Sequence, residues 1–168
     1  ELSTRRRRPR WALAALDLAT GELRATSGSD EELLLDEISR LGAREVVLSD
    51  AQAEDPVLIE VHSHFPELLL TRLDAKVYDA PAALSTLERV VGAEERAAVG
   101  RILPEAALVA GGRALAYAEL TQVRADDPQA KGQPSLRHVD RLRPYVPGDA
   151  LVLDREARDH LELFRSSS

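Results

Sequence analysis

The chain contains no cysteine, and only 4% of its 168 residues are aromatic. The absence of cysteine excludes disulfide bonds, thiolate metal sites and cysteine nucleophiles, and it fits a reducing compartment. Because aromatic residues are scarce, the core has to be built mainly from leucine, valine and alanine. No apolar run approaches the roughly 18 residues of a membrane-spanning helix, and no secretory signal peptide is visible.

What the chain does contain is typical of a folded globular protein. Hydrophobic residues make up 44% and charged residues 30% of the sequence, which is not the composition of a disordered chain. The length corresponds to one or two small domains. The first residue is Glu1 and not methionine, so we expect the chain to be a piece of a longer protein.

Charge is spread unevenly over a formal net of -7. Residues 30–67 carry eleven acidic residues against two arginines, whereas residues 1–10 carry five arginines against one glutamate. A protein that grips duplex DNA needs a broad basic face to displace counterions. The sequence offers no such face, so other parts of a longer protein would have to hold nucleic acid.

Hydrophobic periodicity and turn residues predict strands alternating with helices. Thr20-Gly21 separates the two strands of a hairpin, and a capping box of Ser29 and Glu32 starts the first helix. In order, we expect strands at 11–18 and 22–26, a helix ending at Gly42, a strand at 44–50, a helix at 56–62, a strand at 68–73 and a helix at 80–91. This order predicts an α/β fold with a mixed sheet flanked by helices, compatible with an RNase H-like topology.

After Gly92 the pattern becomes mainly helical. A short linking helix precedes a long helix from Glu105 to about Val123 that is rich in alanine and glycine. Small side chains bury little area each, so this helix needs a close neighbour. A polar loop follows, and then come two extended segments broken at Pro147-Gly148 and a last helix capped by Asp154.

Asp17 ends the first predicted strand and is the first candidate for metal-dependent chemistry. Nucleases of the RNase H type bring several carboxylates together on two metal ions. Asp50 and Asp74 follow other predicted strands and could supply the partners. The alternative is that Asp17 caps a turn while the other two are solvent-exposed loop residues. We favour this alternative, because a fold does not by itself imply a function.

Two further groups of residues suggest ligands. His62 and His64 could bind a metal, but no third ligand stands at a suitable spacing, so we interpret them as residues of a helix end. The run RRRRPR at residues 5–10 suggests nucleic-acid binding or targeting. Its proline favours a solvated turn, with a phosphate contact in the intact protein left open. We therefore predict no catalytic, cofactor-binding or metal-binding residue in the chain.

Several local motifs occur in an order that resembles the MutS family of DNA mismatch-repair proteins. They are LDLATGEL, AREVVLSD, AVGRI, ALAYAELTQ and YVPGDALVLDREARDHLEL, and the resemblance covers Leu2 to Phe164. The most specific part is ALAYAELTQ followed by LDREARDHLEL. The resemblance implies an RNase H-like connector domain at residues 1–92. It also implies an incomplete first segment of the helical core, or lever, domain at residues 93–168.

The resemblance also implies a function. A connector is a non-catalytic part that couples binding of mismatched DNA to the ATPase domain and offers a docking surface for MutL, which we place at Ala82, Ala83 and Thr86. No phosphate-loop motif is present, so ATP and Mg2+ are expected in the parent protein and no cofactor in this fragment. The expected partners are the remaining MutS domains, MutL and, through the parent, mismatched DNA. The parent is expected to be a cytoplasmic homodimer without membrane association.

Two alternatives stay open. One is an RNase H-like, metal-dependent nuclease built around Asp17. The other is an interaction domain of a diverged MutS paralogue, because Ala157 and His160 stand where the family usually has threonine and asparagine. The loop at residues 124–134 is also longer than the usual family link.

Overall fold

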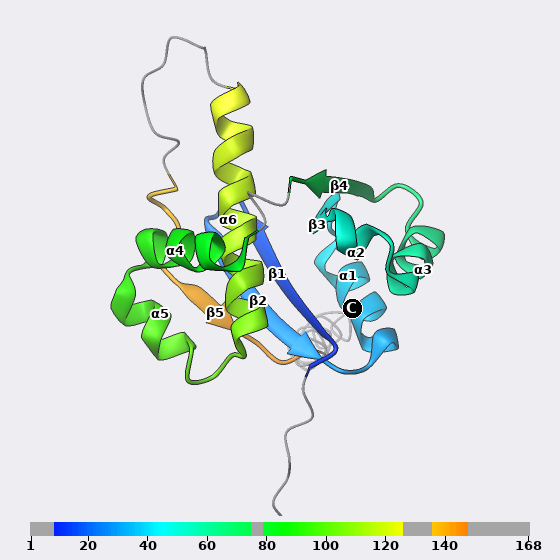
Figure 1. Cartoon of the computed structure of the whole chain (residues 1–168), viewed down its shortest axis with the longest axis horizontal. Coiled ribbons are helices and arrows are strands. Elements are labelled where there is room, and N and C mark those ends of the chain that lie inside the picture. The colour runs from blue at the N-terminus through cyan, green and yellow to red at the C-terminus, as the bar shows by residue number, and fades with distance from the viewer. Residues whose placement is uncertain (1–8, 75–78, 126–135, 148–168) are drawn as a thin grey trace, which may run out of the picture.

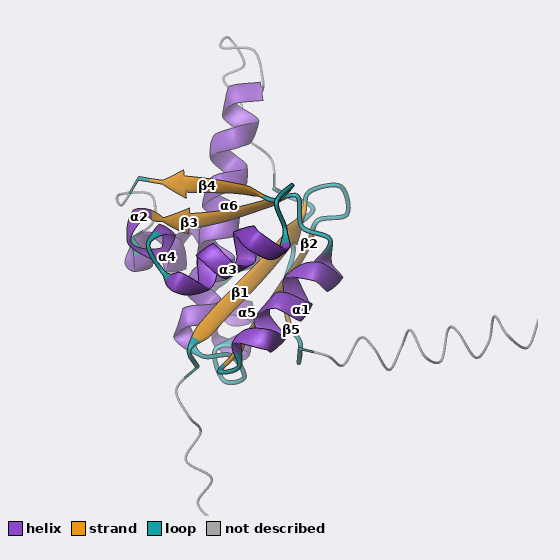
Figure 2. Ribbon diagram, turned by 90° about the vertical axis from the view of Figure 1, so that its right-hand side faces the viewer, coloured by secondary structure: helices purple, strands orange, loops and turns teal. Residues whose placement is uncertain are grey.

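A computed structural model describes residues 9–74, 79–125 and 136–147. In this part of the chain, helices flank two small sheets (Figures 1 and 2), which confirms the predicted α/β class. The predicted helix capped by Asp154, the positions Ala157 and His160, and most of the RRRRPR run lie outside the described residues.

The first sheet is built on the predicted hairpin. Strands β1 (Trp11–Asp17) and β2 (Glu22–Gly28) pair antiparallel, and β5 (Leu142–Pro144) joins β2 in parallel, which gives the order β1-β2-β5. Gly21 closes the hairpin turn at a φ of 73°. A Cβ atom at Gly21 would lie 2.5 Å from the carbonyl oxygen of His138. The turn therefore requires glycine both for its backbone angle and for the close approach of the segment before β5.

The second sheet consists of β3 (Glu45–Ser49) and β4 (Leu69–Leu73), which run parallel. Helix α1 (Glu31–Leu41) connects β2 to β3, while α2 (Asp50–Ala53) and α3 (Pro56–His64) form the crossover that a parallel pair needs. The sequence predicts one mixed sheet. Within the described residues the strands form two sheets instead, because no hydrogen-bonded ladder joins β1 to β3.

Helix ends largely follow the predicted signals. Gly42, at a φ of 58°, ends α1 as expected. The start of α1 differs by one residue, because Asp30 and not Ser29 is the cap and accepts a hydrogen bond from the Glu32 amide at 3.0 Å. Helix α2 was not predicted. A capping box of Ser49 and Gln52 starts it, but four residues are too short to leave a periodic pattern.

Helices α4 (Ala80–Val91), α5 (Ala93–Val99) and α6 (Glu105–Ala125) complete the fold. Helix α6 lies across the hairpin and against α4 (Figure 1). A Cβ atom added to Gly112 would lie only 2.0 Å from the carbonyl oxygen of Ala83. The prediction that the small residues of this long helix serve a close neighbour is therefore confirmed.

The buried side chains form two clusters. The first cluster includes Leu23, Leu87, Leu115 and Leu142, each no more than 1% exposed, and so draws on elements before and after residue 92. The second cluster contains buried residues of α1, α3 and the turn before β4. Alternate residues of β1 contribute to both, as expected for a strand whose successive side chains point to opposite faces. The first cluster therefore shows no break at residue 92, where the sequence predicts the boundary between two domains. As an assignment of family domains, this boundary stays a prediction.

Candidate functional site

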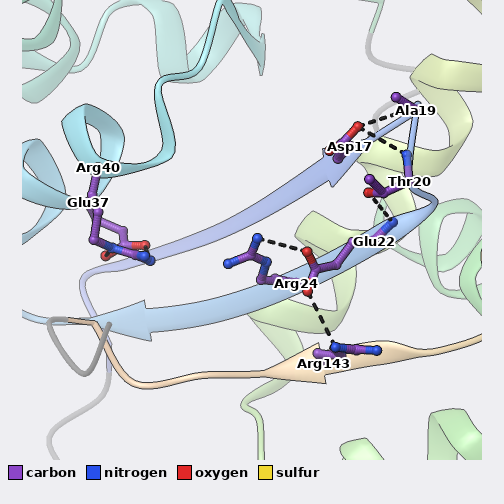
Figure 3. Close-up of polar contacts among 8 residues, drawn as sticks. All are labelled: Asp17, Ala19, Thr20, Glu22, Arg24, Glu37, Arg40 and Arg143. Carbon is purple, nitrogen blue, oxygen red and sulfur yellow. Dashed lines mark hydrogen bonds and ion pairs between the residues drawn. The ribbon is translucent and has the colours of Figure 1, made fainter. Parts of the chain in front are cut away.

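The carboxylate of Asp17 takes part in the hairpin turn (Figure 3). Its Oδ1 atom accepts hydrogen bonds from the backbone amides of Ala19 at 2.8 Å and Thr20 at 3.3 Å. The Ala19 amide, followed by the Thr20 side chain and amide, holds the pKa of Asp17 below its usual value. These contacts agree with the interpretation of Asp17 as a turn residue.

The other candidate ligands are distributed over separate elements. Asp50 lies in the first turn of α2, directly after β3, and Asp74 directly follows β4, so both adjoin the second sheet, whereas Asp17 ends β1 in the first. His62 and His64 are exposed in the last turn of α3, where the Nδ1 atom of His64 lies 3.0 Å from the Glu60 carbonyl oxygen. Among the described residues, no group of three or more His, Cys, Asp or Glu side chains is arranged to hold a metal.

Substitution of Asp17 distinguishes its interpretation as a turn residue from its interpretation as a metal ligand. A depressed pKa means that ionised Asp17 stabilises the fold above its unfolded-state pKa, and that this stabilisation is lost as the pH falls through its folded-state pKa. We expect Asp17→Ala to lower the melting temperature at pH 7 and to differ less from the wild type at strongly acidic pH. Asp17→Asn keeps the acceptor oxygen and should lose less stability.

Thermal unfolding monitored by circular dichroism between pH 2 and pH 7 would check this expectation. A pH-independent difference between wild type and Asp17→Ala would contradict it. Mg2+-dependent cleavage of DNA or RNA that Asp17→Asn abolishes would establish the nuclease alternative instead.

The predicted partner surface lies on α4. Asp79 caps this helix through a hydrogen bond from the Ala82 amide at 3.2 Å, and Gly92 ends it, both as predicted. Ala82 is exposed and Thr86 is half-buried. Ala83, in contrast, is 1% exposed because it faces α6 at Gly112. The inclusion of Ala83 in an exposed surface is therefore wrong, and binding of a partner at Ala82 and Thr86 stays a prediction.

A shallow depression adjoins this part of α4. Its charged groups are engaged within the chain, since Arg89 donates to both carboxylate oxygens of Glu119 at 2.7 Å and Arg96 lies 3.4 Å from Glu88. Small-molecule sites are usually enclosed and largely apolar, unlike this surface. The depression is lined by Pro81, Leu84, Ser85, Glu88, Arg89, Ala93 and Arg96.

Negative charge is concentrated in the elements around the second cluster. Residues 30–74 carry twelve acidic residues and three arginines. Some of these acids pair with arginines of the described residues, for example Glu31 with Arg10 at 2.7 Å. This side of the molecule is unsuited to the phosphate backbone of a nucleic acid.

Sequence reasoning missed two polar groups that join elements. The Glu45 carboxylate of β3 accepts hydrogen bonds from Tyr117 of α6, at 2.5 Å, and from the Thr71 hydroxyl of β4. Glu37 of α1 is buried and paired with Arg40. The three-residue spacing of Glu37 and Arg40 is a visible signal for an ion pair on a helix, but no local pattern connects Glu45 with Tyr117.

None of the helices in the described part of the chain combines the length and the apolar character needed to cross a lipid bilayer.

Comparison with known proteins gives consistent matches. The family described as MutS domain II matches residues 2–130. A DNA mismatch repair protein MutS 2 of Haloarcula marismortui is 31% identical over 169 residues, which cover 95% of this chain and 17% of that protein. DNA mismatch repair protein MutS of Symbiobacterium thermophilum is 34% identical over 93% of this chain and 17% of its own length. The corresponding protein of Anaeromyxobacter sp. (strain K) is 33% identical over 95% of this chain and 16% of its own length. The chain thus spans less than a fifth of the length of these relatives.

Proposed function

The chain belongs to the MutS family and corresponds to its domain II, and we propose that it acts as the connector of a longer mismatch-repair protein, without catalysis of its own. The match to MutS domain II over residues 2–130 is the observation that carries this proposal. The relatives are named DNA mismatch repair proteins. The packing of α6 and β5 on the hairpin further suggests that the connector, with an RNase H-like fold, extends past residue 92 to at least Pro147.

The proposed role is to couple binding of mismatched DNA to ATP hydrolysis in other parts of the parent protein. Such a relay has to move as a stiff body. The contact of Glu45 with Tyr117 supports this property, because it joins β3 to α6, which lie far apart in the sequence. The acidic side built from residues 30–74 supports the placement of DNA elsewhere in the parent. ATP, Mg2+ and the homodimer contact likewise belong to the parent, which we place in the cytoplasm.

We further propose that the exposed face of α4 around Ala82 and Thr86 docks MutL. Ala82 is exposed, and the adjoining depression is lined by both charged and apolar side chains. The charged residues of this surface are already held in place by intramolecular ion pairs. Docking would therefore require little additional ordering of side chains.

A calorimetric titration with the amino-terminal ATPase domain of MutL, in magnesium buffer, tests the docking proposal. We expect saturable binding, and we expect Ala82→Arg to weaken it by at least about tenfold, or roughly 1.4 kcal/mol. Ala51→Arg is the matched control, because Ala51 is also an exposed alanine but lies on α2. Absence of binding by a chain that circular dichroism finds folded would remove the docking claim. It would leave the coupling role in place.

The two alternatives from the sequence differ in their support. The nuclease interpretation gains nothing from the geometry of Asp17, whose Oδ1 accepts two backbone hydrogen bonds. The diverged-paralogue interpretation depends on Ala157 and His160, which lie outside the described residues, and it stays a hypothesis. Failure of the full-length parent to prefer mismatched over matched duplex would favour that interpretation.

A further inference from the structure

A buried ion pair on α1 lies against the residue that follows β5. Glu37 is only 2% exposed, and a buried carboxylate is costly unless it is paired. Arg40 provides the partner, because its Nε atom donates to Glu37 Oε2 at 3.1 Å and its Nη2 atom donates to Oε1 (Figure 3). Two parallel hydrogen bonds fix the plane of the guanidinium group.

The other side of this guanidinium group faces Tyr145. The Cζ atom of Arg40 lies 5.6 Å from the centre of the Tyr145 ring, within the range of a cation–π contact. The Tyr145 amide donates a hydrogen bond to the carbonyl oxygen of Ala25 on β2 at 3.2 Å. Tyr145 is thus attached to β2 through its backbone and to α1 through its ring. Burial, together with the nearby Glu37 carboxylate, raises the pKa of Tyr145, so its phenol stays neutral.

Within the described residues, β5 contacts mainly β2 and α5. It contains three residues, pairs with β2 along one edge, and includes Pro144, which has no amide hydrogen to donate. Leu142 anchors its first position in the first cluster at 1% exposure, and Arg143 lies 3.5 Å from Glu22 at the surface. An exposed ion pair of this kind contributes little. Tyr145 thus provides contacts of the end of β5 with both β2 and α1.

We propose that Glu37, Arg40 and Tyr145 form a clasp that fastens β5 to α1. Opening of the clasp releases β5 from the edge of β2 while the β1–β2 hairpin remains intact. The chain beyond Pro147 forms the remainder of the segment that the sequence predicts to be the core domain, residues 93–168, so the clasp lies where a movement of that remainder would reach the connector. This link to coupling rests on the proposed function, whereas the clasp itself is a property of the chain.

Amide hydrogen exchange on the 168-residue chain, measured by NMR without MutL, nucleotide or DNA, tests the clasp. In Arg40→Ala and in Tyr145→Leu we expect the amides of Arg143 and Tyr145, which face β2, to exchange at least about tenfold faster than in the wild type, through local opening. The amides that join β1 to β2 should change by less than about twofold. Arg89→Ala is the matched control, because it removes an arginine that also donates to both oxygens of one glutamate, but at the surface between α4 and α6.

Arg40→Ala leaves Glu37 buried without its partner and could unfold the chain, so the double variant Glu37→Gln/Arg40→Met provides a second measurement. It removes the charges and the stacked guanidinium group together while keeping similar side-chain volume. Faster exchange confined to residues 142–145 in this variant or in Tyr145→Leu would support the clasp. Unchanged exchange there, or an equal increase throughout the first sheet, would overturn it. Neither result depends on whether MutL binds.

Discussion

A chain that ends at residue 92 is expected to remain unfolded, whereas a chain that ends at residue 147 is expected to fold. The shorter chain lacks α5, α6, β5 and the loops between them, and these segments supply nine of the twelve buried side chains of the first cluster in the described part of the chain. Leu23 and Leu87, which are 1% and 0% exposed in the structure, would lose their cover. Full burial of one such side chain is worth about 1.5–3 kcal/mol, and a whole domain is stable by only about 5–15 kcal/mol.

Far-UV circular dichroism and urea unfolding of the two truncated chains would measure this difference. The chain of residues 1–147 is the matched control, because it keeps every described element. It should unfold cooperatively, with a slope in urea that corresponds to its buried area. Cooperative unfolding of the chain of residues 1–92 would contradict the expectation. It would also restore residue 92 as a structural boundary.

Substitution of Gly112 by valine is expected to destabilise the fold by about 3 kcal/mol, the upper end of the usual cost of overpacking a core. The added Cβ atom would lie 2.0 Å from the carbonyl oxygen and 2.5 Å from the carbonyl carbon of Ala83. Both atoms belong to the backbone of α4, so no side chain can rotate away to make room. Relief requires α4 to move away from α6, which would open the contact between them.

Gly112→Ala provides a sharper test of the same contact. In an exposed helix interior, replacement of glycine by alanine stabilises the helix by up to about 1 kcal/mol. A loss of stability in Gly112→Ala would therefore be opposite to the effect expected from helix propensity, and would report the contact with α4. Ala106→Val is the control for a β-branched residue on α6, because Ala106 is exposed, and it should change the free energy of unfolding by less than about 1 kcal/mol. Urea unfolding would measure all three variants. A Gly112→Ala chain more stable than the wild type would mean that α4 shifts without cost.

Local signals in the sequence predicted most of the elements, because caps and turns depend on neighbouring residues. As predicted, Asp79 caps the start of α4 and Gly92 ends this helix. The predicted turn before Glu22 also joins the two strands of the hairpin. The parallel pairing of β2 with β5 could not be predicted in this way, since Leu23 and Leu142 lie at opposite ends of the described chain. Formation of such a pair depends on α6 and on the packing of the first cluster, neither of which leaves a local pattern.

The candidate site illustrates the same limit. Helix α4 and its ends were predicted, but the direction of each side chain depends on where α6 lies. The family resemblance alone places Ala83 on the partner surface, whereas in the structure it faces Gly112. The pair of Glu37 and Arg40 is visible as a three-residue spacing on a helix, whereas its contact with Tyr145 requires β5 to lie beside β2. The sequence therefore identifies the ion pair of Glu37 and Arg40, but it does not predict that Tyr145 contacts this pair.

The two-sided packing of β1 has a consequence for the register of the hairpin. On one face, Ala12 and Ala14 pack against the first cluster, and on the other, Trp11 and Leu13 pack against the second. Insertion of a single residue into β1 would exchange the two faces, since side chains along a strand alternate with a period of two. Bulky side chains would then press against α6 while alanines left voids beneath α1, so both clusters would fail together. Strand β1 therefore cannot change its length by one residue without repacking both clusters.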